Sequence, residues 1–328
     1  MVESFIKEQR NKYPAMQLQD WMKLLHQSAF GCEHLVSDPL GGVERIREEA
    51  PATPYWVEPL AGEYCRLHLG TGLAPETVGR LFALSARPEP QGAERLEELL
   101  AMLPLSKEEE AAVAAWRAEG FPPCRHSKEY REAYRPAYRV IRKEYAGLLP
   151  LLQRMEEKQG GILAIEGGSA SGKSSLAELL QELYGCSVFH MDDFFLRPEQ
   201  RTPERFAEPG GNVDRERVEQ EILSPLRRGE TVCYRPFDCS VWGLGEPVTV
   251  TPASWSVVEG AYSMHPALAD YYDLSVYLEI TEEKQRERIR KRNSPGLAAR
   301  FFREWIPMEQ RYFKELQVAE RCDLKLNY

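Results

Sequence analysis

A glycine-rich segment between a short apolar run and a helical pattern most constrains the fold of this chain. The segment, residues 167–174, reads Gly-Gly-Ser-Ala-Ser-Gly-Lys-Ser and satisfies G-x-x-x-x-G-K-[ST] at every fixed position. The run at 162–165 before it is typical of a buried strand, and a helical pattern begins at Lys173. Strand, glycine loop and helix in this order predict a phosphate-binding loop of the Walker A type.

Each residue type in this loop has a chemical reason. Glycines let backbone N–H groups turn toward phosphate oxygens, and the dipole of the following helix favours the same anion. Lys173 supplies a cation for the β- and γ-phosphates of ATP, and the Ser174 hydroxyl is a candidate Mg²⁺ ligand. The residues predicted to bind the nucleotide are Gly167, Gly168, Ser169, Ala170, Ser171, Gly172, Lys173, Ser174 and Ser175.

The composition of the chain argues against several classes of protein. With 328 residues, 43% of them hydrophobic and 28% charged, it is expected to fold into two domains. Its net charge of −9 argues against non-specific binding to nucleic acid or to a membrane surface. The sequence has no apolar run of membrane-spanning length and no signal-peptide layout, and its seven scattered cysteines suit a reducing compartment. We therefore expect a cytoplasmic protein.

The first part of the chain, residues 1–157, is expected to form a mainly α-helical domain of unknown role. Apolar residues recur at helical spacing within 18–29, 78–84 and 96–103, and Ser106 is a candidate N-cap. Between 130 and 145, tyrosines alternate with arginines, which on one helix would place an aromatic face beside a basic one. Such a helix either packs with a solvated edge or presents its arginines to an anionic ligand or partner.

Three histidines of this part stand close to a cysteine in the sequence. Thiolates and imidazoles are favoured zinc ligands. None of the pairs has the spacing of a familiar zinc module, so ordinary buried residues are the preferred interpretation and zinc the alternative. The pairs are Cys32 with His34, Cys65 with His68, and Cys124 with His126.

Acidic residues follow two apolar strands expected in the second part. Asp192 and Asp193 come after a strand at 186–190, and Glu259 ends a strand at 255–258. Ligands of open α/β sheets bind at the carboxyl ends of strands, so these carboxylates are expected near the phosphate loop. Asp192 is then a candidate general base, and Glu259 a candidate Mg²⁺ ligand of the Walker B type beside Ser174.

Strands alternate with helices through residues 158–328. The pattern predicts an α/β fold, a P-loop NTPase parallel sheet with helices on both faces. An arginine-dense helix at 281–293 is a candidate lid that carries arginine to a transferring phosphoryl group, with Arg290 as the catalytic candidate. The alternative is a solvated helix with acidic partners. The expected strands are 162–165, 186–190, 231–234, 255–258 and 274–280.

Together these motifs resemble the P-loop kinases of the uridine kinase, nicotinamide riboside kinase and phosphoribulokinase-like group. The resemblance covers roughly residues 160–320, and the helical first part has no counterpart in the ordinary enzymes of that group. It rests on the loop at 167–174, on His-Met-Asp-Asp-Phe-Phe at 190–195, on Val-Val-Glu-Gly at 257–260, and on Ser-Pro-Gly at 294–296 with Trp-Ile-Pro-Met at 305–308.

The resemblance implies roles for further residues. Asp192 matches the general base of the group, and Asp214 matches its aspartate that binds ribose hydroxyls. Residues 234–238, Tyr-Arg-Pro-Phe-Asp, are similar to the segment that borders the nucleoside, but Cys-Ser-Val-Trp at 239–242 replaces the histidine-and-arginine continuation of uridine kinases. Recognition of a pyrimidine is therefore not implied. The candidate acceptor-binding residues are Asp193, Asp214, Tyr234 and Asp238.

The sequence thus predicts an ATP- and Mg²⁺-dependent phosphotransferase that acts on a hydroxyl of a small nucleoside-, ribosyl- or sugar-like metabolite. The alternative is an ATP-gated binding protein whose helical domain holds a protein partner. The expected partner is a small-molecule phosphoryl acceptor, with neither nucleic acid nor membrane, and a homodimer is left open. The identity of the acceptor does not follow from the sequence.

Overall fold

The computed structural model describes residues 2–32 and 42–327, which fold into two compact units, Met1–Leu149 and Pro150–Tyr328. The division falls in the first turn of α9 (Leu149–Lys158). The boundary after residue 157 that was expected from the sequence stays a prediction.

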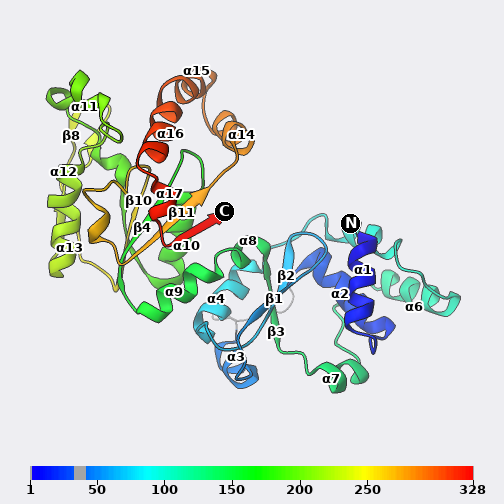
Figure 1. Ribbon diagram of the computed structural model, residues 1–328. Coiled ribbons are helices and arrows are strands. Elements are labelled where there is room, and N and C mark those ends of the chain that lie inside the picture. The colour runs from blue at the N-terminus through cyan, green and yellow to red at the C-terminus, as the bar shows by residue number, and fades with distance from the viewer. Residues whose placement is uncertain (1, 33–41, 328) are drawn as a thin grey trace. The chain divides into compact units, whose positions relative to one another are not determined.

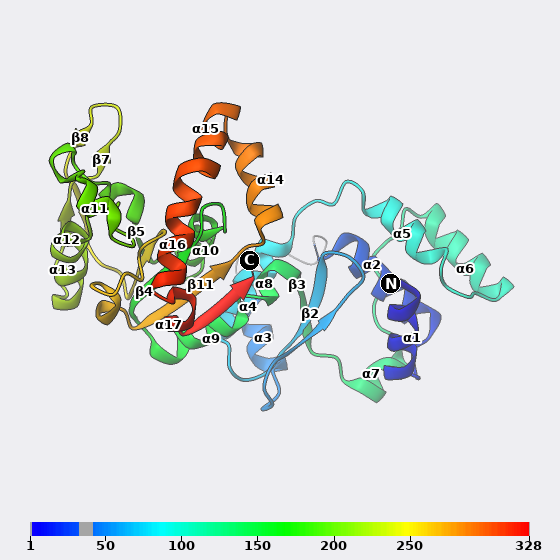
Figure 2. The ribbon, with the colours of Figure 1, turned by 45° about the horizontal axis from the view of Figure 1, so that its top comes forward.

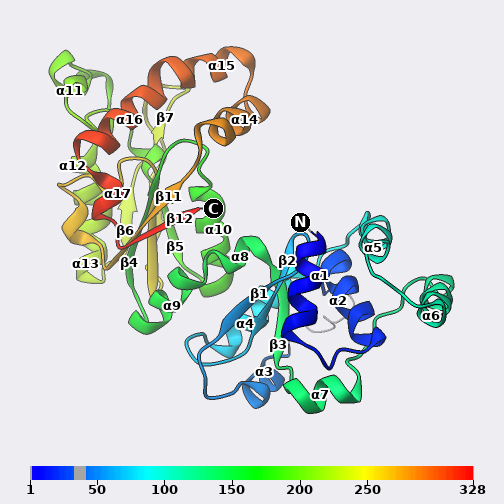
Figure 3. The ribbon, with the colours of Figure 1, turned by 45° about the vertical axis from the view of Figure 1, so that its right-hand side comes forward.

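The N-terminal unit is mainly α-helical, as expected, but it also contains a three-stranded antiparallel sheet of order β1-β2-β3 (Figure 1). Helix α2 packs on β2 and on α5, and Leu24, Leu25 and Leu96 are fully buried between them (Figure 3). Its helices are α1 (Val2–Lys12), α2 (Leu18–Phe30), α3 (Val43–Glu49), α4 (Pro75–Ser85), α5 (Gly92–Leu100), α6 (Lys107–Ala118), α7 (Lys128–Tyr134) and α8 (Lys143–Ala146), and its strands are β1 (Trp56–Pro59), β2 (Tyr64–His68) and β3 (Tyr138–Arg142).

The start of α6 is confirmed. Ser106 is its N-cap, and its hydroxyl accepts a hydrogen bond from the Glu109 N–H at 3.3 Å. The Glu109 carboxylate in turn accepts from the Ser106 N–H at 2.8 Å, which completes a capping box. The sequence signal and the local hydrogen bonds therefore agree at this helix end.

The prediction of a single tyrosine- and arginine-rich helix between residues 130 and 145 is wrong. The segment contains α7, then β3, then α8. Proline at 136 disfavours a helical conformation at the residue before it, and Arg135 takes a left-handed conformation with φ 41° at the end of α7. Arg139 then pairs with Glu49 at 2.8 Å, inside the unit, so the aromatic and basic faces of one helix do not form.

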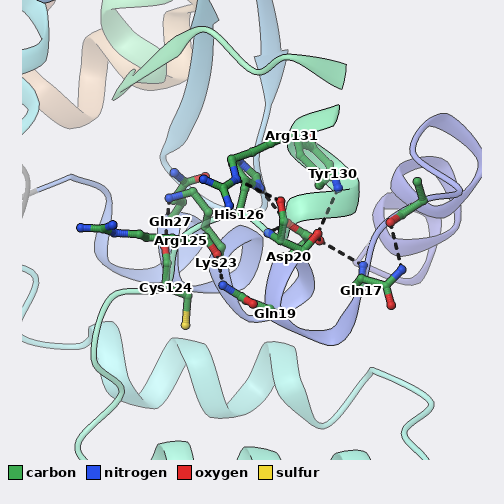
Figure 4. A network of polar contacts seen from close by, with 12 residues as sticks. Gln17, Gln19, Asp20, Lys23, Gln27, Cys124, Arg125, His126, Tyr130 and Arg131 are labelled. Atoms are coloured by element: carbon green, nitrogen blue, oxygen red, sulfur yellow. Dashed lines mark hydrogen bonds and ion pairs between the residues drawn. The ribbon is translucent and has the colours of Figure 1, made fainter. Parts of the chain in front are cut away.

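A chain of buried polar side chains crosses the core of the N-terminal unit. Asp20 on α2 accepts a hydrogen bond from His126 at 2.8 Å (Figure 4). It also accepts from the Ser127 N–H and hydroxyl, at 3.0 and 2.6 Å. His126 contacts the Tyr138 hydroxyl at 2.6 Å through its other ring nitrogen. Burial, partly opposed by Asp20, lowers the pKa of His126 to about 4, so the ring is neutral near pH 7.

The chain of polar contacts continues to a buried ion pair. Gln27 bridges Tyr138 and the guanidinium of Arg66, and Arg66 also binds Glu58 at 3.2 Å. Lys12 and the Tyr13 hydroxyl each donate to Glu58 at 2.7 Å. Arg66 and Glu58 are each no more than 2% exposed, so neither charge can be solvated by water if its partner is removed.

The C-terminal unit is built on a five-stranded sheet of order β12-β11-β4-β10-β5, parallel throughout. This confirms the expected P-loop α/β architecture. Its strands are β4 (Gly161–Gly167), β5 (Ser187–His190), β6 (Val232–Tyr234), β7 (Phe237–Asp238), β8 (Gly243–Leu244), β9 (Val248–Val250), β10 (Trp255–Glu259), β11 (Leu274–Glu279) and β12 (Leu324–Asn327).

Helical segments cover this sheet and connect its strands. They are α9, α10 (Lys173–Tyr184), η2 (Met191–Phe194), η3 (Pro198–Gln200), α11 (Pro203–Ala207), α12 (Arg215–Arg217), the π-helical η4 (Val218–Leu223), α13 (Ser224–Arg228), η5 (Ala269–Tyr271), α14 (Glu282–Arg292), α15 (Pro295–Arg300), the π-helical η6 (Phe301–Trp305), α16 (Ile306–Glu315) and α17 (Val318–Arg321). Helices α14, α15 and α16 form an arm beyond the end of β11 (Figure 2).

One expected strand lies outside the parallel sheet. Strand β6 pairs antiparallel with β9 instead, and β7 pairs with β8 in a second short hairpin. The alternation of Val232 and Tyr234 with exposed residues suits a hairpin with one buried face rather than a central strand buried on both faces. The edge strand β12 was not expected from the sequence.

Within the described residues, no helix is both long enough and apolar enough to span a membrane.

The buried ion pair of the N-terminal unit gives a stability prediction. Arg66→Met leaves the Glu58 carboxylate buried with one cation fewer, and we expect a loss of about 3 kcal/mol in the free energy of unfolding of this unit. Hydrogen exchange of the β2 amides in increasing urea measures it. The control is Arg45→Met, which removes a surface pair with Glu49 and is expected to cost less than about 0.5 kcal/mol. Similar small losses in both variants would contradict the prediction.

Candidate active site

Three neighbouring strands of the C-terminal unit end in the residues that the sequence pattern selected. Strand β10 lies between β4 and β5, with Glu259 in register with Ile165 on one side and His190 on the other. Since the strands are parallel, the loop after β4, the acid at the end of β10 and Asp192 after β5 leave the sheet at the same edge. The structure thus brings the predicted loop, Glu259 and Asp192 together.

The loop at 167–174 needs glycine at its two ends. Gly167 has φ 146°, and a Cβ there would lie 2.7 Å from the Leu278 carbonyl oxygen. Gly172 has φ 104° and is the N-cap of α10. Both conformations are ones that side-chain-bearing residues rarely adopt, so the sequence motif and the backbone path agree. The loop therefore leads directly into the N-terminus of α10, where backbone N–H groups are free to bind an anion.

The candidate Mg²⁺ ligands are in contact. The Ser174 hydroxyl donates to Glu259 at 3.0 Å, and His190 shares the same carboxylate oxygen at 2.7 Å. Burial opposes ionisation of Glu259, but the hydrogen bond with His190 and the charge of Lys173 hold its pKa below the usual value. The hydrogen bond to Glu259 in turn raises the pKa of His190. A hydroxyl and an ionised carboxylate are hard oxygen ligands, and this donor set fits Mg²⁺ together with phosphate oxygens.

Asp192 and Asp193 lie in η2, just after β5. Loss of solvation raises the pKa of Asp192, as do the negative charges of Glu259 and Asp193, while the positive charge of Lys173 acts in the opposite sense. A raised pKa brings a carboxylate closer to the range in which it can accept a proton near neutral pH. Asp193 accepts a hydrogen bond from the Tyr234 hydroxyl at 3.2 Å. The structure therefore brings these two predicted acceptor-binding residues together.

Asp214 is also buried, and it caps a helix. One carboxylate oxygen accepts from the Arg217 N–H at 3.4 Å, and its own N–H donates to the Phe194 carbonyl at 2.8 Å, which ties it to η2. Its other carboxylate oxygen has no hydrogen-bond partner within the described part of the chain, although the Arg197 Nε lies 3.8 Å away. A buried acceptor left in this state suits a ligand hydroxyl.

Asp238 has a local role. It accepts from the N–H and the hydroxyl of Ser240 at 2.7 and 2.6 Å, which shapes the turn after β7. The same hairpin carries Phe237, whose ring lies 6.3 Å from that of Phe195, and the exposed Trp242. Phe237 thus lies beside the segment that contains Asp192, while the carboxylate of Asp238 is occupied within its own turn.

The arginine that reaches the loop is not the one selected from the sequence. Arg288 on α14 donates to the Ala170 carbonyl at 3.0 Å. The guanidinium of Arg290 instead lies over the ring of Phe302, 5.5 Å from its centre, and that of Arg286 lies 4.9 Å from the same ring. The helix of the predicted lid therefore contacts the loop, through Arg288 in this structure.

The cysteine and histidine pairs of the N-terminal unit do not converge. Within residues 2–32 and 42–327, no three histidine, cysteine or acidic side chains form a group that could hold a metal ion. The three cysteines each donate to a backbone carbonyl, and His126 is engaged by Asp20 and Tyr138. His34 lies outside the described residues. The described partners give no support to a zinc site.

Three residues at this edge were missed by the sequence analysis. His190 was quoted only as part of a motif, although its register beside Glu259 follows from the parallel pairing of β5 with β10. Glu309 is buried on α16 on the same face as Ile306 and Tyr312, so an acidic residue on an apolar helical stripe was the available signal. Glu166 stands inside an apolar strand immediately before the loop, which was an equivalent signal.

Glu166 is fully buried and joins three segments. Its carboxylate accepts from the N–H groups of Gly167, Tyr262 and Met264 at 2.8, 3.2 and 2.9 Å, and from the Tyr312 hydroxyl at 3.0 Å. Burial raises the pKa of Glu166 to about 7 even though these donors favour the ionised form. This carboxylate therefore fastens the start of the loop to the segment after β10 and to α16.

Comparisons with known proteins bear on the fold alone. No model of a known protein family matches the chain, and no curated protein matches it significantly. It is similar to the structure of a possible uridine kinase from Bacillus stearothermophilus, with 22% identity and a TM-score of 0.40, over 51% of this chain and 89% of that one. It is also similar to deoxyadenosine kinase from M. mycoides with bound dATP, with 13% identity and a TM-score of 0.26, over 51% and 90% of the two chains. Likeness of this degree does not establish a function.

The buried carboxylate before the loop gives a pH prediction. Because the folded pKa of Glu166, about 7, lies above its ordinary value, the folded state holds a proton that the unfolded state releases between these two values. The stability of the C-terminal unit therefore falls as pH rises through this window, by up to about 1.4 kcal/mol per pH unit. Urea unfolding at pH 5, 6 and 7 measures the slope. Glu166→Gln cannot titrate and removes this contribution, and equal slopes for both proteins would exclude Glu166 as its source.

Proposed function

We propose that the C-terminal unit is a kinase that transfers the γ-phosphoryl group of ATP to a hydroxyl of a small metabolite. The observation that carries this proposal is the arrangement at the ends of three adjacent parallel strands. There the glycine loop, the Ser174–Glu259 contact and Asp192 lie at one edge of the sheet. A site that only binds a nucleotide needs the glycine loop and the Ser174–Glu259 contact. The additional carboxylate of Asp192, with its raised pKa, suits phosphoryl transfer to an acceptor hydroxyl.

In this proposal the amides at the end of the loop and the start of α10, together with Lys173, bind the β- and γ-phosphates of ATP. The Lys173 ammonium lies 3.0 Å from the Gly168 carbonyl, within the loop, so its position is already fixed there. Ser174 and Glu259 would hold Mg²⁺, which supplies charge neutralisation on the phosphates when bound. Arg288 is in contact with the loop and is the lid arginine best placed to stabilise the transferring group.

Asp192 acts as the general base. The acceptor hydroxyl gives its proton to the Asp192 carboxylate as its oxygen forms a bond to the γ-phosphorus. The bond from that phosphorus to the β–γ bridging oxygen breaks, and ADP leaves with that electron pair. The negative charge of Glu259 and the loss of solvation, which raise the pKa of Asp192, increase its affinity for this proton.

The acceptor is a nucleoside, a ribosyl compound or another polyol-like metabolite in this proposal. Support comes from the Asp193–Tyr234 contact and from the buried Asp214 oxygen, which accepts no hydrogen bond from the described residues although Arg197 lies 3.8 Å away. Both carboxylates offer acceptors for hydroxyl groups. The aromatic side chains of Phe195 and Phe237 lie beside η2 and could pack against a planar group. These contacts favour a ligand with several hydroxyls and a ring.

Asp192 gives the central test of the proposal. Incubation with Mg²⁺, ATP and a panel of hydroxylated metabolites, followed by mass spectrometry, identifies any phosphorylated product. With the acceptor found, we expect Asp192→Ala to lower kcat by at least about 10²-fold, because general-base catalysis is lost, while ATP still binds. Asp270→Asn is the control, since Asp270 is exposed and lies in η5, before β11 and therefore at the edge of the parallel sheet opposite to the loop. Near-normal turnover by Asp192→Ala would remove Asp192 from the base role, and a silent panel with tight ATP binding would contradict the kinase.

The Ser174–Glu259 contact gives a metal prediction. Ser174→Ala removes one hard ligand and leaves the carboxylate in place. We expect the Mg²⁺ concentration for half-maximal activity to rise about tenfold, the change that the loss of roughly 1.4 kcal/mol of binding produces. Initial rates over a Mg²⁺ titration at saturating ATP measure this. The control is Ser224→Ala, a serine on α13. An unchanged Mg²⁺ requirement in Ser174→Ala would exclude the hydroxyl as a ligand.

A further inference from the structure

One peptide unit of the glycine loop is held from both sides. Its carbonyl, that of Gly168, accepts hydrogen bonds from the Lys173 ammonium at 3.0 Å and from the Ser171 N–H at 3.1 Å. Its N–H, that of Ser169, donates to the carboxylate of Glu309 at 2.9 Å. A peptide unit is planar and trans, so its N–H and C=O point in opposite directions. The Glu309 carboxylate therefore determines the direction in which the Gly168 carbonyl faces Lys173.

The hold of Glu309 on this peptide unit is reinforced. The Ser169 hydroxyl donates to the other carboxylate oxygen of Glu309 at 2.5 Å. The next two carbonyls of the loop, those of Ser169 and Ala170, accept from Gln285 at 2.9 Å and from Arg288 at 3.0 Å. Both of these donors lie on α14. Successive peptide units of the loop are thus fixed by α16 and by α14, and only the first of them also contacts Lys173.

Glu309 is itself rigidly placed. It is 5% exposed and lies on α16 with the buried Ile306 and Tyr312 on the same face. Burial raises the pKa of Glu309, and the positive charge of Lys173 acts in the opposite sense. The Glu309 carboxylate therefore interacts electrostatically with Lys173, and it also orients the Gly168 carbonyl that Lys173 binds. A carboxylate buried at this position costs desolvation, which a side chain needed only for packing would avoid.

We propose that Glu309 is a positioning residue for Lys173, which it acts on through the Gly168–Ser169 peptide unit. It aims the carbonyl that holds the ammonium, so that Lys173 meets the phosphates of the nucleotide without first reorganising. The hydrogen bonds of Glu309 go to Ser169 of the loop, so its action on Lys173 is indirect. This inference rests on the proposed function, since that function gives Lys173 its role on the phosphates.

Binding of a fluorescent ATP analogue in the presence of Mg²⁺ tests the inference without an acceptor. Glu309→Ala frees the peptide unit, and we expect the analogue to bind about tenfold more weakly, as for the loss of one charge-assisted hydrogen bond. Glu309→Gln keeps an oxygen acceptor for the Ser169 N–H and is expected to bind within about twofold of the parent. Glu315→Ala, at an exposed glutamate of the same helix that pairs with Arg311, is the matched control and is expected to change nothing.

A double-mutant cycle separates positioning from a general loss of structure. If Glu309 acts through Lys173, Glu309→Ala weakens binding in the parent but has no further effect in a Lys173→Ala background. Full additivity of the two losses would overturn the proposal, as would parent-like binding by Glu309→Ala or equal losses for Ala and Gln at 309. A parent protein that binds the analogue but phosphorylates no acceptor contradicts the kinase and leaves this inference standing. A parent protein that does not bind the analogue overturns both.

Discussion

Parallel pairing of β10 between β4 and β5 is the constraint on which the candidate active site depends. The pairing sets Glu259 level with Ile165 and with His190. Gly167 of the loop and Asp192 each follow two residues after these partners. A shift of the register by one residue would turn Glu259 to the opposite face of the sheet and separate it from Ser174. Apolar side chains of the three strands, Ile162 and Ala164 on β4, Phe189 on β5 and Val258 on β10, are buried in one cluster. Their packing stabilises the register that aligns the polar groups at the edge of the sheet.

Residues that act through local patterns could be predicted from the sequence. The loop at 167–174 and the Ser106 cap depend on residues within a few positions of each other, and the sequence predicted both at the positions where they occur. The three strands of the N-terminal unit were not predicted. Strand β3 pairs with β2 over a long separation, with Tyr64 opposite Arg142, and the break at 136 was missed among helix-forming neighbours. The β1–β2 hairpin, with Pro59 opposite Cys65, is local and was missed as well. Glu309 could not be assigned a role from the sequence, since its partner Ser169 lies 140 residues away along the chain.

Both units contain a buried carboxylate, and the two carboxylates are stabilised by different kinds of partner. Burial would raise the pKa of Glu58, but the hydrogen bond with His68 and the charges of Arg66 and Lys12 hold it well below the usual range. Glu166 is met by backbone N–H groups, which satisfy its oxygens without a full opposing charge, and its pKa is raised. The first arrangement makes the carboxylate a permanent anion that ties α1 to the sheet. The second leaves a group that can exchange a proton near neutral pH at the base of the loop.

The order of strands in the parallel sheet also governs how this unit acquires its native state. Strand β4 is central in the sheet and ends at Gly167. Its two neighbours come much later in the chain, since β10 begins at Trp255 and β11 at Leu274. Until they are synthesised and dock, β4 presents an apolar, unpaired strand, and closing such long loops is slow. The start of the glycine loop lies against both neighbours: a Cβ at Gly167 would meet the Leu278 carbonyl of β11, and the Gly260 N–H after β10 donates to the Ile165 carbonyl. The nucleotide site is therefore complete only after both strands have docked on β4.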